Sequence, residues 1–253
     1  MDLKGKKAII VGGASGMAKA SAELLVERGA SVAILDRPQS AGAEVAEALG
    51  GTFHEVDVMD GDATEAAIDA GVEALGGELH ISVNTAGGGA ARRTLSKDGP
   101  HPLEEFRRVV ELNLIASFNV ARLAANHMQR NEPEDDERGV IISTASIAAF
   151  EGQIGQVAYT AAKAGIAGMA LTMARDLGSL GIRALAIAPS LFHTGITQGI
   201  PDEFATALTK DAAFPKRMGR PEEYGKLVVA ICENPMLNGS CIRLDAGQRF
   251  APK

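Results

Sequence analysis

Short apolar segments alternate with longer helical patterns along almost the whole chain. The apolar segments are 8–11, 31–35, 52–56, 79–83, 140–143, 182–187 and 241–244, and the helical patterns between them are 15–28, 41–49, 63–75, 103–128, 156–177 and 221–233. Continuous apolar strands joined by amphipathic helices are typical of a parallel sheet that is covered on both faces. We therefore predict one doubly wound α/β domain with seven strands and six helices, which suits a chain of 253 residues.

Composition and charge exclude several classes of function. The chain has 25 Lys and Arg against 32 Asp and Glu, and this net charge of −7 argues against general binding of nucleic acid, which needs a basic surface. Its two cysteines, Cys232 and Cys241, predict free thiols in a reducing compartment. No run approaches the roughly 18 apolar residues of a membrane span, so we expect a soluble, cytoplasmic protein. The histidines show no metal-ligand spacing, so no metal site is predicted, and the polar run 130–138 is expected to be a solvated loop.

A glycine-rich turn, GGASGM at residues 12–17, follows the first apolar segment and opens a helical pattern. Backbone N–H groups at a helix N-terminus bind phosphate when no Cβ atom blocks a close approach, and Gly12 and Gly16 meet that need. An ordinary strand-to-helix turn is the alternative, but the position after the first strand favours a dinucleotide site. We predict that Gly12, Ser15, Gly16 and Met17 contact the dinucleotide.

The end of the second apolar segment carries Asp36, which lies 20 residues after Gly16. A carboxylate at this position accepts hydrogen bonds from the adenine ribose hydroxyls and repels a 2′-phosphate. A helix cap is the alternative role for Asp36, and the neighbouring Arg37 favours a 2′-phosphate to some extent. On balance the sequence predicts NAD as the cofactor in preference to NADP.

One of the two tyrosines has a basic residue on the same helix face. Tyr159 and Lys163 are four residues apart, and Ser146 lies 13 residues upstream of Tyr159, just after an apolar segment. An ammonium group and the positively charged nicotinamide both favour the phenolate, so Lys163 and the cofactor are expected to lower the pKa of Tyr159 and make it a general acid and base. Tyr and Lys at this spacing often form only a surface pair. Their occurrence together with the dinucleotide turn and with Ser146 makes a coincidence improbable. Ser146 is expected to hold a substrate oxygen.

These motifs together resemble the short-chain dehydrogenase/reductase family over essentially the whole chain. The resemblance implies that Asn113 continues a proton relay from Lys163 through a water molecule, and that Lys163 also binds the nicotinamide ribose. It assigns further cofactor contacts to Asp57, Val58, Thr85, Ala86, Gly87, Tyr159, Pro189 and Phe192. Ala18 and Ser190 depart from the family pattern, in which both positions are glycine.

A narrower resemblance, to the type II 3-hydroxyacyl-CoA dehydrogenases of this family, rests on segments 139–146, 149–153 and 233–239. It implies NAD-dependent interconversion of 3-hydroxyacyl-CoA and 3-oxoacyl-CoA, with Ser146, Tyr159, Gln153 and Gln156 at the substrate. An insertion at 91–102 would flank the acyl-CoA, and its residues Arg92, Arg93 and Lys97 could meet CoA phosphates or form a solvated loop.

The resemblance also implies the organisation of the whole protein. We expect a Rossmann-type fold, a single NAD(P)-binding domain at 1–253, a substrate loop at 190–215 and a homotetramer. Two alternatives for function remain open, which are a family member with another substrate (a steroid, a small alcohol or a 3-oxoacyl carrier protein) and a non-catalytic nucleotide-binding scaffold.

Overall fold

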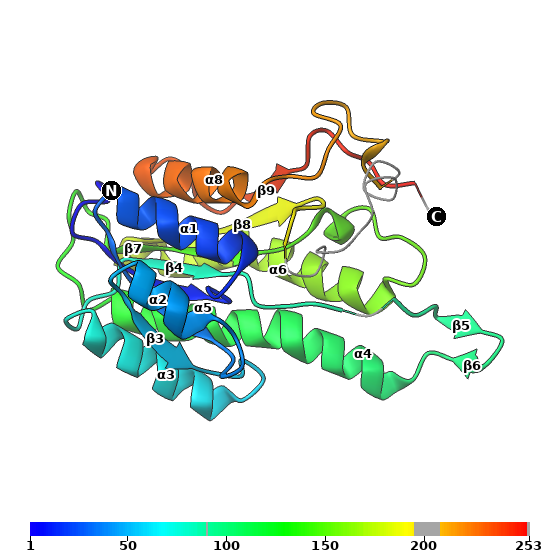
Figure 1. Ribbon diagram of the computed structural model, residues 1–253, viewed down its shortest axis with the longest axis horizontal. Coiled ribbons are helices and arrows are strands. Elements are labelled where there is room, and N and C mark those ends of the chain that lie inside the picture. The colour runs from blue at the N-terminus through cyan, green and yellow to red at the C-terminus, as the bar shows by residue number, and fades with distance from the viewer. Residues whose placement is uncertain (90, 195–207, 252–253) are drawn as a thin grey trace.

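A seven-stranded parallel sheet forms the centre of the molecule (Figure 1), a computed structural model that describes residues 1–89, 91–194 and 208–251. The strand order is β3-β2-β1-β4-β7-β8-β9. The strands are β1 (Lys7–Val11), β2 (Ser31–Asp36), β3 (Thr52–Glu55), β4 (Ile81–Asn84), β7 (Gly139–Thr144), β8 (Ile182–Pro189) and β9 (Cys241–Leu244). Each of the seven predicted strands is present, and the predicted doubly wound α/β fold is confirmed.

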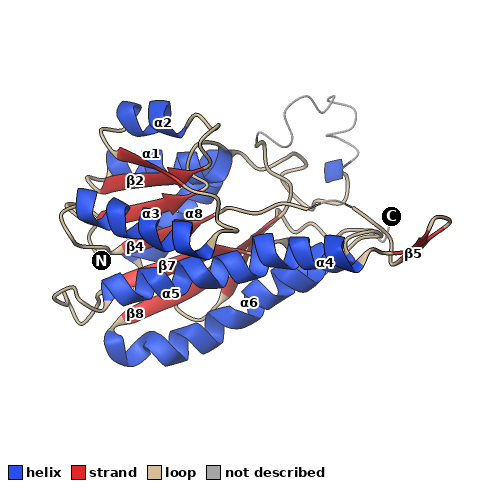
Figure 2. Cartoon of the chain, turned by 90° about the horizontal axis from the view of Figure 1, so that it is seen from below, coloured by secondary structure: helices blue, strands red, loops and turns tan. Residues whose placement is uncertain are grey.

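Helices cover both faces of the sheet (Figure 2). The helices α1 (Gly16–Glu27), α2 (Gly42–Ala48) and α8 (Pro221–Glu233) pack on one face, and α3 (Gly61–Ala74), α5 (Ala116–Met128) and α6 (Val157–Leu177) pack on the other. Strand residues alternate between the two cores, because Ala8 and Ile10 of β1 pack toward α1 while Ile9 and Val11 pack toward α3 and α5. The continuous apolar sequence of each strand follows from this two-sided burial.

The helix predicted at 103–128 is present with the same limits, but it contains a π-helical turn that the sequence did not predict. The helix consists of α4 (Leu103–Val110), a π-helical turn at Glu111–Ile115 and α5. A second feature that the sequence analysis did not predict is the two-stranded antiparallel hairpin of β5 (Leu95–Ser96) and β6 (Gly99–Pro100), which lies inside the 91–102 insertion. Part of the predicted substrate loop, residues 195–207, lies outside the described residues.

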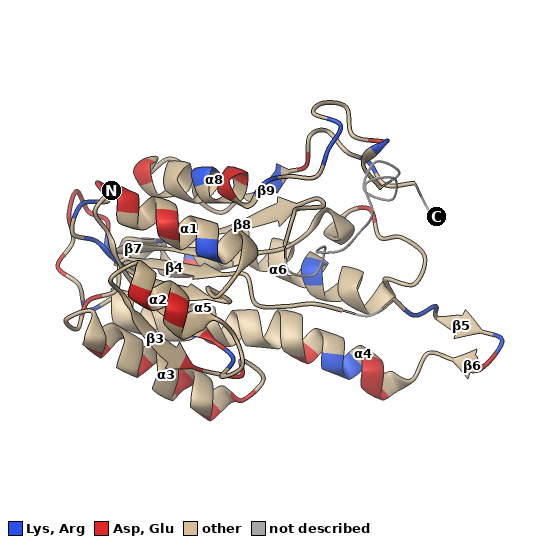
Figure 3. Cartoon of the chain, viewed as in Figure 1, with Lys and Arg blue, Asp and Glu red and all other residues tan. Residues whose placement is uncertain are grey.

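Charged residues are distributed unevenly among the helices and strands (Figure 3). Helices α2 and α3, on either side of the β3 edge, carry Glu44, Glu47, Asp62, Glu65, Asp69 and Glu73 and no Lys or Arg. This edge of the molecule is therefore acidic. Among the described residues, no helix is both long enough and apolar enough to cross a membrane.

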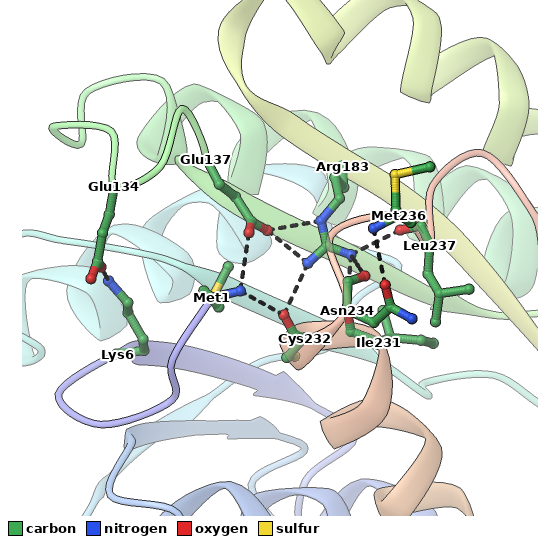
Figure 4. A network of polar contacts seen from close by, with 10 residues as sticks. All are labelled: Met1, Lys6, Glu134, Glu137, Arg183, Ile231, Cys232, Asn234, Met236 and Leu237. Atoms are coloured by element: carbon green, nitrogen blue, oxygen red, sulfur yellow. Dashed lines mark hydrogen bonds and ion pairs between the residues drawn. The ribbon is translucent and has the colours of Figure 1, made fainter.

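The polar run 130–138 is the loop that the sequence predicted between α5 and β7, and residues 130 and 132–136 are exposed, but the loop also contains buried polar contacts. The Glu137 side chain is only 10% exposed and pairs with Arg183 of β8, which is 7% exposed, at 2.7 Å (Figure 4). The N-terminal ammonium group of Met1 also donates to Glu137, at 3.2 Å. Asn131 is buried as well, where it donates to the carbonyl group of Leu79 at 2.6 Å. These buried polar groups are stabilised by partners that are distant in the sequence, namely the Arg183 side chain, the Met1 ammonium group and the Leu79 carbonyl group.

Candidate active site

The glycine-rich turn leads from the carboxyl end of β1 into the N-terminus of α1. Gly12 has φ +80° and Gly16 has φ +55°, conformations that L side chains rarely adopt. A Cβ atom on Gly12 would lie 2.9 Å from Thr85 Oγ1, so the turn packs directly on the segment that follows β4. Ser15 is the N-cap residue of α1. The free N–H groups of this helix end therefore face the carboxyl edge of the sheet.

A cavity of about 450 Å³ lies at this edge. Ten of the residues that the sequence assigned to the cofactor line it, which are Gly12, Ser15, Gly16, Met17, Asp36, Asp57, Val58, Thr85, Ala86 and Gly87. Six further residues line the cavity without having been predicted, namely Val11, Leu35, Arg37, Val56, Leu112 and Thr194. Of these, Leu112 belongs to the unpredicted π-helical turn, and no sequence motif marked it.

Asp36 is fixed at the end of β2 by two main-chain hydrogen bonds. Its Oδ2 atom accepts from the N–H group of Ala14 at 2.9 Å, and its Oδ1 atom accepts from that of Arg37 at 2.7 Å. The carboxylate is thus oriented by the glycine-rich turn itself and borders the cavity. It remains an acceptor for hydroxyl donors, since each carboxylate oxygen has a second lone pair.

Ser146, Tyr159 and Lys163 come together beside the cavity. Ser146 follows β7 and accepts a hydrogen bond from the N–H group of Ala148 at 3.1 Å, while its hydroxyl group also bonds to Tyr159. The Lys163 Nζ atom lies 5.5 Å from the centroid of the Tyr159 ring and donates to the Thr144 carbonyl oxygen at 2.8 Å. The structure thus places the three side chains that the sequence analysis grouped next to one another.

Burial dominates the ionisation of this cluster. It raises the pKa of Tyr159, and the hydrogen bond from Ser146 opposes that rise. Burial also lowers the pKa of Lys163 to about 8. The sequence predicts that Lys163 together with a bound nicotinamide lowers the pKa of Tyr159. In the protein without a nicotinamide the direction is the opposite, because desolvation outweighs the other influences on the phenol.

Two glycines connect the cluster to the cavity. A Cβ atom on Gly87, which lines the cavity, would lie 3.3 Å from Lys163 Nζ and 2.6 Å from Asn113 Oδ1. A Cβ atom on Gly89 would lie 3.1 Å from the Tyr159 ring. The backbone after β4 therefore passes closely against all three side chains, and only glycine permits this approach.

Asn113 is completely buried in the π-helical turn. Its Nδ2 atom donates to the carbonyl oxygens of Gly88, at 2.6 Å, and Val109, at 2.9 Å, and its Oδ1 atom accepts from the N–H group of Gly88 at 3.1 Å. Turns of π-helix are frequent at functional sites. Here the turn brings the amide of Asn113 to the segment that borders the cavity.

A second cavity of about 750 Å³ lies between the 91–102 insertion and the start of α6. Its lining includes Gln153 and Arg93 but not Gln156, whose Oε1 atom accepts from the N–H group of Gln153 at 3.1 Å. Arg92 pairs with Glu105 at 2.8 Å instead of facing this cavity. Of the two predicted substrate glutamines, therefore, one lines the cavity and the other supports it.

Several predicted cofactor residues lie outside the lining of the first cavity, namely Tyr159, Lys163, Pro189 and Phe192. The Phe192 side chain is buried in the core, where its ring packs edge-to-face on Tyr224 with the centroids 6.5 Å apart. Ala18, which stands at a family glycine position, is fully buried in the same core. In the described part of the chain, no three His, Cys, Asp or Glu side chains group in a way that could hold a metal ion.

The chain matches the short chain dehydrogenase family over residues 6–205. It belongs to this family, as the motifs predicted, and is an oxidoreductase; such dehydrogenases use a nicotinamide cofactor and act on small molecules. It is 47% identical to 3-hydroxyacyl-CoA dehydrogenase type-2 of Homo sapiens, over 99% of this chain and 97% of the human protein. The protein of the same name from Drosophila melanogaster is 46% identical, over 99% of this chain and 100% of that one. A crystal structure of 3-hydroxyacyl-CoA dehydrogenase type-2 from Mycobacterium avium superposes with a TM-score of 0.94 at 40% identity, covering 98% of both chains.

Proposed function

We propose that this protein is an NAD-dependent dehydrogenase that interconverts 3-hydroxyacyl-CoA and 3-oxoacyl-CoA. The observation that carries the proposal is the grouping of Ser146, Tyr159 and Lys163 beside a cavity that Asp36 and the glycine-rich turn also border. Relatives that are 46–48% identical over 99% of the chain are named for this reaction.

The choice of NAD rests on the first cavity. A nicotinamide dinucleotide fits its lining, because the N-terminus of α1 and the side-chain-free Gly12 and Gly16 suit a pyrophosphate. Asp36 suits the two ribose hydroxyls and would repel a 2′-phosphate. Arg37 also lines the cavity, but its neighbour Asp36 is the residue that the turn orients. Asp57, Val58 and the Thr85–Gly87 segment would hold the adenosine half and the middle of the dinucleotide.

The proton chemistry is assigned to Tyr159. During oxidation its phenolate accepts the proton of the substrate hydroxyl group, and a bound nicotinamide supplies the hydride acceptor. Ser146 already accepts from the N–H group of Ala148, so its hydroxyl hydrogen remains available to donate to the phenolate or to the substrate oxygen. Lys163 adds a positive charge next to the Tyr159 ring. Asn113 is assigned the proton relay that the family resemblance implies. Since burial raises the pKa of Tyr159, the oxidation rate should rise with pH.

The substrate class is assigned from the relatives and from the second cavity. A space of about 750 Å³ lined by Ile154, Val157 and Leu95 suits an apolar acyl chain and a thioester arm. Arg93 in the same lining could bind an anionic group such as a CoA phosphate. Gln153 would then lie beside the substrate, with Gln156 as its support.

A substrate panel followed by NADH absorbance tests the proposal. It should contain 3-hydroxyacyl-CoA esters of several lengths, a 3-hydroxyacyl carrier protein, a hydroxysteroid and a small secondary alcohol, each with NAD and with NADP. We expect the highest kcat/KM for a CoA ester with NAD, and at least about a tenfold lower value with NADP, a gap that Asp36→Ala should narrow. A preference for another alcohol would reject the substrate assignment, equal use of both cofactors would reject the role of Asp36, and no turnover at all would favour a scaffold.

We also propose a homotetramer of single-domain subunits. Ile115 and Phe118, near the start of α5, are 45% and 48% exposed, and Leu171 of α6 is 47% exposed. Large apolar side chains with this exposure favour burial against a second copy. The cytoplasmic location and the substrate loop at 190–215 stay predictions.

A further inference from the structure

Tyr224 of α8 has no exposed surface, yet its hydroxyl group is not in an apolar environment. The Tyr224 hydroxyl oxygen lies 2.7 Å from Thr144 Oγ1, and Thr144 Oγ1 lies 2.6 Å from the Asn84 carbonyl oxygen. A carbonyl oxygen only accepts, so Thr144 must donate its single hydroxyl hydrogen to Asn84. Tyr224 is therefore the donor to Thr144, and the chain of hydrogen bonds has one direction.

Thr144 stands between this chain and the active site. It is the last residue of β7, two positions before Ser146, and its own carbonyl oxygen accepts the 2.8 Å hydrogen bond from Lys163. Asn84 is the last residue of β4 and directly precedes Thr85, which lines the first cavity. The Thr144 hydroxyl group thus joins the two strand ends from which the proposed catalytic and cofactor-binding segments begin.

The two contacts on Thr144 come from opposite faces of the sheet. Tyr224 belongs to the core beneath α1 and α8, whereas Lys163 comes from α6 on the other face. The same Tyr224 ring packs edge-to-face on Phe192, in the segment that leads to the cavity residue Thr194. Tyr224 lines neither cavity, so any influence on the site is indirect, and Thr144 and Phe192 are the contacts that lead toward it.

We propose that Tyr224 is a positioning residue for Lys163, which acts by fixing Thr144 so that its carbonyl oxygen holds the Lys163 ammonium group. This rests on the proposed function, because it assumes that Lys163 serves the dehydrogenase reaction. Without the Tyr224 hydroxyl group, Thr144 keeps its bond to Asn84 but loses the partner that restrains it from the α8 side. The Thr144 carbonyl oxygen then holds the Lys163 ammonium group less precisely. This weakens the contacts of Lys163 with Tyr159 and with the cofactor ribose.

The test compares Tyr224→Phe, Thr144→Val and Thr144→Ser with the wild-type enzyme. Tyr224→Phe and Thr144→Val should each lower kcat about five- to tenfold and raise the KM for NAD, with the KM for the alcohol unchanged, since one hydrogen bond contributes about that much. Thr144→Ser keeps the hydroxyl group and should restore kcat to within about twofold. The double variant Tyr224→Phe with Thr144→Val should be no worse than the poorer single variant, because both changes break the same chain.

Thr64→Val is the matched control. Thr64 is a buried threonine of α3 whose hydroxyl group donates to the Asp60 carbonyl oxygen at 2.7 Å, and neither residue lines a cavity. This control should lose a similar amount of thermal stability with kcat unchanged. If Tyr224→Phe behaves like the control, with kcat and the KM for NAD of the wild-type enzyme, the inference is overturned while the proposed function stands. A wild-type chain that oxidises no alcohol in the panel would overturn both.

Discussion

Replacing Arg183 with methionine should strongly destabilise the fold without touching the proposed active site. The Arg183 guanidinium group donates to Glu137 at 2.8 Å and to the carbonyl oxygens of Ile231, Leu237 and Cys232 at 2.8, 2.8 and 3.1 Å. Figure 4 shows these partners converging from the 130–138 loop and from the C-terminal end of α8 and the segment after it. One side chain of β8 therefore joins the 130–138 loop to residues 231–237, two segments that are distant in the sequence.

The magnitude follows from burial. The Arg183 and Glu137 side chains are 7% and 10% exposed, so removing the arginine leaves Glu137 with the Met1 ammonium group as its one remaining charged partner and takes the guanidinium donor away from the carbonyl groups of Ile231 and Leu237. Breaking one side of a buried ion pair costs about 3–5 kcal/mol. For a chain of this size each kcal/mol lowers Tm by about 2–4 °C, so we expect Tm to fall by about 6–20 °C.

Thermal and urea unfolding followed by circular dichroism measure this effect. The matched control is Arg28→Met, which removes an arginine that pairs with Glu233 at 2.6 Å but is 55% exposed. An exposed pair contributes about 0–1 kcal/mol, so Tm should change by less than about 4 °C. Equal losses for Arg183→Met and Arg28→Met would refute the reasoning from burial.

Three further predictions concern the site and the assembly. Lys163→Met should abolish most turnover yet raise the stability at pH 7 by about 1–3 kcal/mol, because burial lowers the pKa of Lys163 from 10.5 to about 8. The difference in unfolding free energy between Lys163→Met and the wild type should disappear between pH 8 and 10.5, because in this range the folded wild type has released the Lys163 proton while the unfolded chain still binds it. A lower Tm of the variant at pH 7 would contradict the argument. Gly12→Ala should weaken NADH binding, measured by fluorescence, at least about tenfold. The control Gly50→Ala should leave NADH binding unchanged, because Gly50 also has a positive φ but a Cβ atom there meets nothing within 4 Å. Phe118→Glu should dissociate the proposed tetramer, measured as a lower mass in light scattering, and an unchanged mass would contradict the proposed interface at α5.

The strands and the main site motifs could be predicted because their signals are local. A strand buried on both faces has a continuous apolar sequence, and the predicted segment 241–244 has the same limits as β9. The glycine-rich turn and the pair Tyr159 and Lys163 are likewise defined by spacing within a few residues. The family resemblance extended these local motifs to the whole chain.

The features that were missed depend on partners far away in the sequence. Glu137 lies in an acidic run that has no local sign of burial, and its partner Arg183 is 46 residues away. The contact between Thr144 and Tyr224 spans 80 residues. The π-helical turn around Asn113 was invisible for another reason, because one extra residue in a turn leaves the apolar pattern of a long helix almost unchanged.

The central claim is that Tyr159 moves the proton in an alcohol oxidation, and the kcat of Tyr159→Phe tests it most directly. This change removes one oxygen atom and keeps the ring that packs against Gly89. We predict that kcat falls by about 10²–10⁴-fold, the range for a positioned acid–base group, while Tm and the affinity for NADH stay close to those of the wild type. A folded Tyr159→Phe protein that keeps most of its activity would contradict the account.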